Sequence, residues 1–412
     1  MRFLHYLFFS LVILKPVLGE GQGIETPQMT AAATQTRMNI IIESNTRFAL
    51  ELYQKLRKQR GNLIYSPYAI STALSMVTLG AKSATLAQLQ STIHYSATLS
   101  PLSGDLNDEI IAETGRNDGQ VFLSNITWFQ QGLKLMPSFQ NIMGRDFKSS
   151  PQFVDFAGAL ITAVRQINQT VSKATRNRIN LIISNQDLSP ETKFVLTSGI
   201  VMKGQWAQIF DIKQTTRAVF NQAETITLRV ELMKTTGLFP LFSQDQLDVI
   251  QIPFLNQAGT GPSLTMVIAV PKGDFNLEKL EDSLTLENWR HWIRQAAVKP
   301  VNLYMPKFRV EGRFNLIELL KEFGVTAPFS SEADFSSITD VKGIFLNYAT
   351  HRTSLRIDER GSEATSSSIA SPPSITPEQG TPYDLMVTRP FLFFVIDKNT
   401  ETIIFMGKVI RP

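Results

Sequence analysis

Four histidines and no cysteine limit the nucleophilic or metal chemistry that this chain of 412 residues could carry out. The histidines stand at positions 5, 94, 291 and 351, too far apart for the HExxH spacing that holds zinc on one helix face. The absence of cysteine excludes thiol catalysis and thiolate metal sites. The sequence also lacks a G-x-S-x-G elbow, a phosphate loop and a dinucleotide glycine fingerprint. We therefore predict a protein that is not an enzyme and uses no metal or cofactor; a hydrolase with dispersed Ser, His and Asp is the alternative.

A different kind of chemistry is indicated by the stretch from Gly361 to Val387. Its first part is almost entirely Gly, Ala, Ser and Thr, and its second part is rich in proline, including Pro372 and Pro373. Such a segment cannot bury enough apolar surface to offset its chain entropy, which predicts an exposed loop. A loop of this length between strands is either functional or a linker. As a protease substrate it would offer no basic cleavage site, because it contains no Lys or Arg.

The elements around this loop predict one large α+β domain over residues 38–412. A strand-like run at 353–358 enters the loop, and the apolar runs 391–396 and 402–406 after it indicate a hairpin. Earlier, helices are predicted from about Met38 to Lys58 and from Pro67 to Leu79; the second begins after a capping Ser66. A further helix is predicted at 314–323. No internal repeat or clear linker divides the chain.

The N-terminus matches a secretory signal over residues 1–19, with Arg2 before an apolar run that is too short to span a bilayer. Residues 20–37 read as a disordered leader. Removing the signal takes away Arg2 and Lys15 and no acid, so the mature chain is nearly neutral and no nucleic-acid partner is indicated. We expect a secreted, extracellular monomer without a membrane anchor, and its lack of cysteine means that a large core must stabilise it.

Several blocks of sequence stand in an order typical of one family. They are Asn62-Leu-Ile-Tyr-Ser-Pro67 with Gly80-Ala-Lys, Phe329-Ser with Ala333-Asp-Phe-Ser336, Leu385-Met-Val-Thr-Arg-Pro-Phe-Leu-Phe-Phe-Val395 and the close Ile404-Phe-Met-Gly-Lys-Val-Ile-Arg-Pro412. Over about residues 38–412 the chain resembles the serpin family of serine protease inhibitors. The resemblance implies three β-sheets with about eight or nine helices, and it makes residues 361–387 the reactive loop.

The resemblance also implies a mechanism, in which an extracellular serine protease attacks the loop and forms an acyl-enzyme. The first part of the loop then inserts as a strand into the central sheet and traps the protease. Insertion would place alternate side chains beneath the sheet. If Ser362 faces inward, the same set holds only small uncharged residues, and the larger Glu363 and Ile369 fall in the other set. The hinge residues that the resemblance implies are Glu359, Gly361, Ser362, Glu363, Ala364, Thr365 and Ser366.

Other positions match the residues beneath the start of insertion and at the centre of the sheet. The resemblance pairs Lys307 with Glu359, although two solvated charges are the simpler interpretation. It also implies structural roles for Ser66, Ser198, Trp206 and His351. Ser198 stands where the family usually has asparagine, and Ala69 where it usually has serine. The polar contacts at the centre of the sheet are therefore expected to be fewer than is usual in the family.

Family spacing places the scissile bond between Ile375 and Thr376, which favours an elastase-like or chymotrypsin-like target over a trypsin-like one. Pro372 and Pro373 count against insertion, because proline donates no ladder hydrogen bond. A non-inhibitory carrier, chaperone or protease decoy with the same fold is therefore the alternative. Two sequons offer glycosylation candidates at Asn125 and Asn168.

Overall fold

The computed structural model describes residues 31–96, 99–100, 104–106, 110, 121–255, 264–362 and 380–412. Its α-helices in these ranges are α1 (Ala31–Leu56), α2 (Pro67–Thr78), α3 (Ser83–Ile93), α5 (Pro137–Phe147), α6 (Phe156–Ala174), α7 (Leu277–Asp282), α8 (Leu286–Arg294) and α9 (Leu316–Lys321). Its strands up to β8 are β1 (Leu63–Tyr65), β2 (Val121–Gln130), β3 (Gln152–Val154), β4 (Phe194–Met202), β5 (Gly204–Gln205), β6 (Thr216–Ala223), β7 (Ile226–Ser243) and β8 (Leu247–Pro253). The later strands are β9 (Leu264–Pro271), β10 (Ala297–Pro306), β11 (Phe308–Asn315), β12 (Tyr348–Ile357), β13 (Gly361–Ser362), β14 (Tyr383–Met386), β15 (Phe391–Asp397) and β16 (Thr402–Val409).

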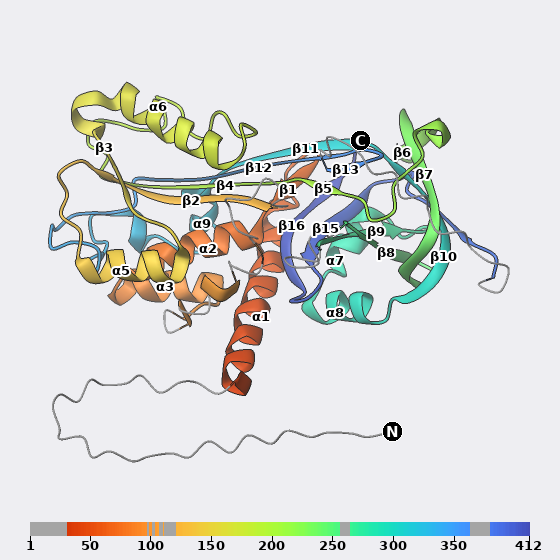
Figure 1. Ribbon diagram of the computed structural model, residues 1–412, viewed down its shortest axis with the longest axis horizontal. Coiled ribbons are helices and arrows are strands. Elements are labelled where there is room, and N and C mark those ends of the chain that lie inside the picture. The colour runs from red at the N-terminus through yellow and green to blue at the C-terminus, as the bar shows by residue number, and fades with distance from the viewer. Residues whose placement is uncertain are drawn as a thin grey trace, which may run out of the picture.

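A five-stranded central sheet runs in the order β11-β12-β4-β2-β3. All nine residues of β4 are buried, because α6 covers one face of the sheet and the main core covers the other. Burial on both faces explains why this strand is an almost unbroken apolar run. In Figure 1 α6 lies above the sheet, and α2, α3 and α5 lie below it. The two middle strands, β12 and β4, are parallel neighbours with no strand between them.

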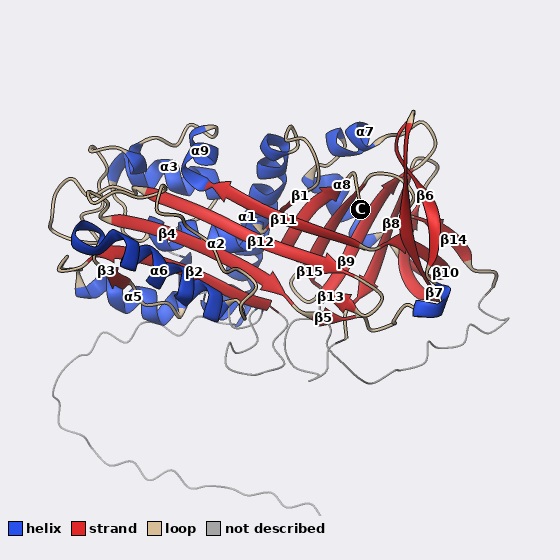
Figure 2. Ribbon diagram, turned by 90° about the horizontal axis from the view of Figure 1, so that it is seen from above, coloured by secondary structure: helices blue, strands red, loops and turns tan. Residues whose placement is uncertain are grey.

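A nine-stranded sheet runs in the order β1-β16-β15-β9-β8-β7-β10-β14, with β6 paired to β7. Figure 2 shows this sheet at one end of the molecule and the helices α3, α5, α6 and α9 around the central sheet at the other. Both strands of the hairpin β15–β16 are buried along their whole length. A two-stranded ladder of β13 and β5 completes the three sheets. The α+β fold that the sequence predicted is confirmed, with three sheets and with eight α-helices that are described along their whole length.

Strand β1 lies between the two large sheets, and its backbone closely approaches the backbones of both. It pairs with β16 through Leu63 and Lys408, and its other side lies against β11. A Cβ added to Gly407 would lie 1.9 Å from the Leu63 carbonyl oxygen, and one added to Gly312 would lie 2.1 Å from that of Ile64. Only glycine allows so close a backbone approach on both sides of β1.

The structure differs from the sequence predictions at three boundaries. Helix α1 begins at Ala31, within the segment expected to be a disordered leader. The helix predicted at 314–323 starts later, because residues 308–315 alternate buried and exposed and belong to β11. The segment 361–387 is not a loop throughout, since its ends form β13 and β14. In the described part of the chain, no helix combines the length and apolar character needed to cross a bilayer.

Candidate functional site

The centre of the central sheet holds a buried polar cluster of Ser66, Ser198 and His351. Ser198 lies opposite His351 in the β12–β4 register, and its Oγ is 3.0 Å from His351 Nδ1. The Ser66 backbone N–H donates to His351 Nε2 at 3.1 Å. All three residues are fully buried. The structure brings these three residues together, and the serine at 198 reaches the histidine.

Hydrogen bonding fixes the protonation state of His351. A backbone N–H can only donate, so Nε2 accepts, and the neutral ring carries its proton on Nδ1, which donates to Ser198 Oγ. Burial lowers the pKa of His351 from 6.5 to about 3. The Phe314 ring stacks on the imidazole at 6.3 Å, which adds an apolar wall. At neutral pH the cluster therefore carries no charge.

Asn125 extends this cluster, a role that the sequence did not reveal. It lies opposite Ser198 on β2, and its Nδ2 donates to the Ala69 carbonyl oxygen at 2.9 Å. The residue is only 8% exposed. Asn125 is therefore withdrawn as a glycosylation candidate, because a sugar on this nitrogen has no room in the folded chain.

Asn168, the asparagine of the second sequon, is hydrogen-bonded to the segment that follows α6. Asn168 on α6 is half-buried, and its Nδ2 donates to the Ile183 carbonyl at 2.8 Å. Its Oδ1 accepts from the backbone N–H groups of Ile182 and Ile183. A glycan on Nδ2 would compete with these contacts, so the folded structure favours neither sequon as an acceptor.

Lys307 and Glu359 form an ion pair between the end of β12 and the start of β13. Lys307 Nζ lies 2.8 Å from Glu359 Oε1, and the Thr215 hydroxyl donates to the same oxygen at 2.8 Å. Burial raises the pKa of Glu359, but the hydrogen bonds from Lys307 and Thr215 outweigh it and leave the pKa below its usual value. Lys307 also contacts Glu231 at 3.2 Å. The predicted pair is therefore formed, and the simpler interpretation of two solvated charges is wrong.

Trp206 packs beneath the segment that follows the end of β12. Its ring stacks on Phe254 with 4.3 Å between centroids, and its Nε1 donates to the Asp358 carbonyl at 2.9 Å. Its backbone N–H donates to the Arg360 carbonyl. A fully buried tryptophan with its N–H satisfied thus holds the chain where it leaves β12.

The first two loop residues, Gly361 and Ser362, pair antiparallel with Gln205 and Gly204 of β5. Gly361 has a φ of +127°, and a Cβ there would meet the Gly204 carbonyl oxygen at 2.1 Å. Ser362 is fully buried, and its Oγ donates to the Met202 carbonyl. The start of the loop is therefore already a strand, paired with β5 in the two-stranded sheet. The predicted positions that lie outside the described residues are Glu363, Ala364, Thr365, Ser366, Pro372, Pro373, Ile375 and Thr376.

The far end of the loop is anchored by residues that the sequence did not single out. Tyr383 on β14 donates its hydroxyl to Asp248 Oδ2 at 3.0 Å, and Lys272 Nζ lies 3.1 Å from Asp248 Oδ1. One position along, Asn302 Nδ2 donates to Asp384 Oδ1 at 2.7 Å. Nothing in the sequence links Tyr383 with an acid 135 residues earlier.

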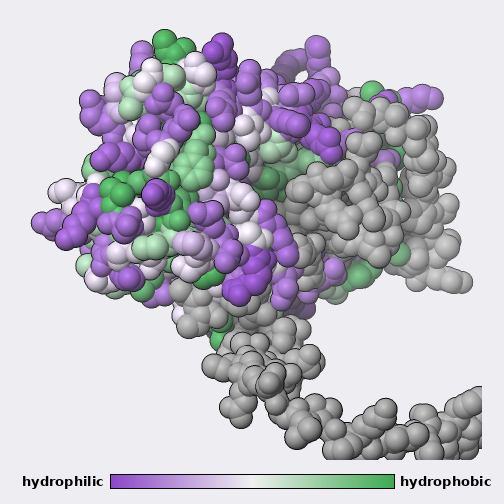
Figure 3. Space-filling model, turned by 60° about the vertical axis from the view of Figure 1, so that its left-hand side comes forward, coloured by the Kyte–Doolittle hydropathy of each residue, from purple (hydrophilic) through white to green (hydrophobic). Residues whose placement is uncertain are grey.

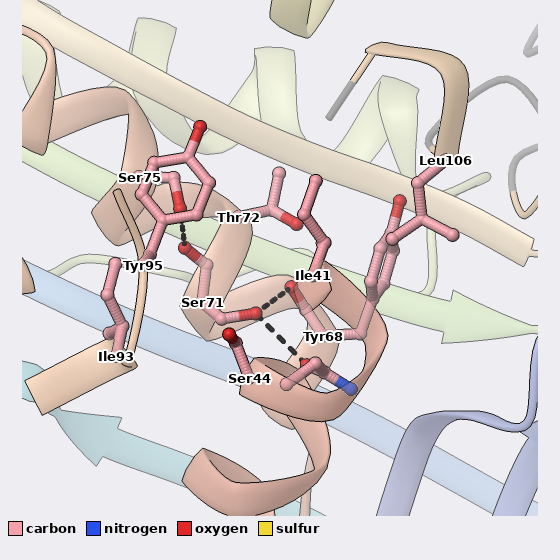
Figure 4. A pocket seen from close by; sticks show the side chains of 10 residues that line it. Ile41, Ser44, Tyr68, Ser71, Thr72, Ser75, Ile93, Tyr95 and Leu106 are labelled. Carbon is pink, nitrogen blue, oxygen red and sulfur yellow. Dashed lines mark hydrogen bonds between the residues drawn. The ribbon is translucent and has the colours of Figure 1, made fainter. Parts of the chain in front are cut away.

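A small cavity between α1, α2 and the end of α3 offers no ligand site. Figure 4 shows Ser71 among its lining residues. The Ser71 hydroxyl is hydrogen-bonded to Asn45 and Tyr68, and that of Ser75 donates to the Ser71 carbonyl. The cavity measures about 30 Å³. This leaves room for one or two water molecules and for no larger molecule.

Comparison with known proteins assigns the class. A family model described as "Serpin (serine protease inhibitor)" matches residues 43–412. The chain therefore belongs to the serpin family, a family of serine protease inhibitors and not of enzymes, and the resemblance of its sequence blocks is confirmed.

Individual relatives cover almost the whole chain. "Leukocyte elastase inhibitor A" of Mus musculus is 30% identical over 394 residues, 91% of this chain and 100% of that protein. The crystal structure of native protease nexin-1 with heparin has a TM-score of 0.80 at 23% identity and covers 91% of this chain and 100% of that one. Thyroxine-binding globulin complexed with thyroxine has a TM-score of 0.76 at 25% identity and covers 91% and 99% of the two chains.

Proposed function

We propose that this serpin is a secreted suicide inhibitor of an elastase-like or chymotrypsin-like serine protease. The protease serine attacks the carbonyl carbon of Ile375, the bond to Thr376 breaks, and the amine of Thr376 takes up a proton and leaves. The acyl-enzyme stays attached to the loop. The loop segment after Ser362 then separates β12 from β4 and becomes a strand between them, carrying the protease along.

The backbone register is the observation that carries this proposal. Gly361 and Ser362 are already paired with β5, and a bridge joins Asp358 to Gly361. Continued along both neighbours, these pairings bring Ser368 opposite Ser198 on one side and His351 on the other. Those two residues already face each other in the parallel register. Three independent pairings thus define one register for the inserted strand.

This register gives each inward position a defined environment. Ala364 would lie opposite Met202 and Leu355, both fully buried in the main core. Ser368 would lie between Ser198 and His351 and could replace the hydrogen bond that insertion breaks. The new strand would gain ladder bonds on both sides at about 1 kcal/mol net each. Over ten or so residues this amounts to roughly 10–20 kcal/mol, comparable with the stability of a whole domain.

The same register weakens the objection raised by the two prolines. Pro372 would lie opposite Phe194, the first residue of β4, and Pro373 beyond it. The ten residues 362–371 could therefore insert before a proline meets the sheet. Proline is tolerated at the end of a strand, where no ladder hydrogen bond is lost.

The sequence and one relative support the target class, and the N-terminal sequence supports secretion. The segment 361–387 has no basic residue, and one relative carries the name of an elastase inhibitor. Secretion rests on the signal-like residues 1–19. It is tested by sequencing the N-terminus of protein collected from the culture medium, which should begin at or near Glu20.

A denaturing gel tests the inhibitor proposal. The protein is mixed with pancreatic elastase or chymotrypsin, and we expect a complex that survives denaturant, together with a cleaved form of higher melting temperature. The released C-terminal fragment should begin at Thr376. Cleavage without a stable complex and without a rise in melting temperature would refute inhibition and favour the carrier or decoy alternative.

Two loop variants test the register itself. Ala364→Arg would place a charged side chain between Met202 and Leu355, so we expect cleavage without trapping. Glu363→Arg carries the same side chain on the outer face, opposite the exposed Arg356, and should still trap the protease. Equal trapping by both variants would show that the register is wrong.

A further inference from the structure

A groove of about 640 Å³ runs between α6 and the segment that follows it, far from the reactive loop in sequence. One wall is α6, and the other is the segment 177–185. Asn168 fixes the second wall to the helix, because its Nδ2 donates to the Ile183 carbonyl and its Oδ1 accepts from the N–H groups of Ile182 and Ile183. Ser172 adds another such bond, donating its hydroxyl to Asn180 Oδ1 at 2.7 Å. The groove is therefore built into the fold and has a size typical of ligand sites.

The charged side chains that line this groove are all cationic. Arg165 and Lys173 line it, both exposed, and its other lining residues are amides, hydroxyls and aliphatic side chains. Between Asp155 and Asp187 the sequence has four cations and no acid. Among the described residues, neither Arg165 nor Lys173 is within 4 Å of a carboxylate. Two uncompensated cations beside amide donors match an anionic ligand.

Exposed apolar side chains also border the groove. Ile161 is 70% exposed on α6, and Leu181 is 48% exposed on the other wall. On the side of the molecule shown in Figure 3, hydrophilic residues predominate and apolar ones form small separate patches. A sulfated polysaccharide has no apolar side chain to cover Ile161 and Leu181. A peptide can supply both carboxylates and apolar side chains.

We propose that this groove binds an extended acidic segment of a partner protein. Arg165 and Lys173 are eight residues apart on one helix, a separation of about 12 Å. Two acidic side chains at positions i and i+4 of an extended peptide lie on the same face about 13 Å apart. Such a segment would contact both cations, and its apolar side chains would cover Ile161 and Leu181. This inference does not depend on protease inhibition.

Fluorescence anisotropy with a labelled peptide tests the proposal. The probe carries two glutamates four positions apart, flanked by leucines, with Ser and Gly elsewhere. The full-length mature protein is made in a host that adds no N-glycans. We expect saturable binding that weakens as salt rises from about 50 to about 300 mM. Arg165→Glu or Lys173→Glu should weaken binding about tenfold or more, since each removes a charge-assisted hydrogen bond.

Matched controls make the test decisive. Lys299→Glu changes charge equally at an exposed site on β10 and should bind like wild type. A peptide with glutamines in place of glutamates should lose binding. No binding up to about 1 mM, or binding unaffected by both groove variants, would overturn the proposal. Heparin binding that these variants abolish, or a dimer that they dissociate, would assign the groove to a glycan or to a second copy and would equally overturn it.

Discussion

Protonation of His351 should lower the free energy of unfolding, and the structure gives the size of the effect. The ring is fully buried, and its pKa is lowered from 6.5 to about 3. The protonated ring would carry a hydrogen on Nε2, which would point at the Ser66 N–H that now donates to it. The ion would thus lose one hydrogen bond and place two donors face to face inside the core.

The sign follows from the direction of the pKa shift. Because the pKa in the folded state is below that in the unfolded state, the unfolded chain binds the proton first as pH falls. The free energy of unfolding that neutral His351 contributes is therefore fully present above pH 6.5 and is lost progressively toward pH 3. Between about pH 7.5 and about pH 5 the loss is about 2 kcal/mol from this residue alone.

Urea unfolding at the two pH values measures this loss. Wild type should lose about 2 kcal/mol more on acidification than His351→Gln, whose amide cannot titrate in this range. His291→Gln, at an exposed position on α8, shows what the loss of an imidazole elsewhere does. If wild type and His351→Gln lose the same free energy on acidification, the assignment of the pH dependence to His351 is refuted.

Three further substitutions test the residues at the start of the loop. Lys307→Gln should lower the free energy of unfolding by about 1–3 kcal/mol, because Glu359 then keeps a nearly buried charge without its partner. Adding Glu359→Gln should restore part of this loss. No change in the urea midpoint would mean that the ion pair contributes nothing to stability. Trp206→Phe keeps the ring stack on Phe254 but loses the hydrogen bond to Asp358, so the free energy of unfolding should fall by about 1 kcal/mol. Trp206→Ala also removes the packing of the ring and should lower it by about 3–5 kcal/mol. Equal losses in the two variants would show that the packing of the ring contributes nothing. Gly361→Ala should break the β13–β5 pairing and reduce protease trapping, since its Cβ would overlap a backbone oxygen; unchanged trapping on a denaturing gel would show that this pairing is not needed.

The sequence predicted those parts of the structure whose information is local. Ser66-Pro67 marks a helix start, and the caps observed at α2 confirm it. The apolar runs of β15 and β16 predict a hairpin because their pattern and turn lie within twenty residues. The resemblance to the serpin family, rather than residue spacing, grouped Ser66, Ser198 and His351.

What the sequence could not show depends on register between distant strands. Asn125 reads as a sequon, and only its pairing opposite Ser198 shows that its amide is buried. Tyr383 reads as part of an exposed loop, and only the parallel pairing of β14 with β10 places it near Asp248. The last residues of β11 also fit the start of a helix, so the sequence alone does not separate the strand from the helix.

The position of β1 has a consequence for biosynthesis. Ser66, directly after β1, donates its hydroxyl to the Ile404 carbonyl, 338 residues later, and the Asn62 amide donates to Arg411, 349 residues later. A ribosome adds about 5–20 residues per second, so β1 waits on the order of 20–70 s for its partner strand to be made. During that time the surfaces of α1 and α2 that pack against β16 in the folded chain remain uncovered. Part of the α1 and α2 surface of a nascent chain therefore stays uncovered until β16 (Thr402–Val409) is made, and a stop codon that removes β16 is expected to leave the chain unfolded.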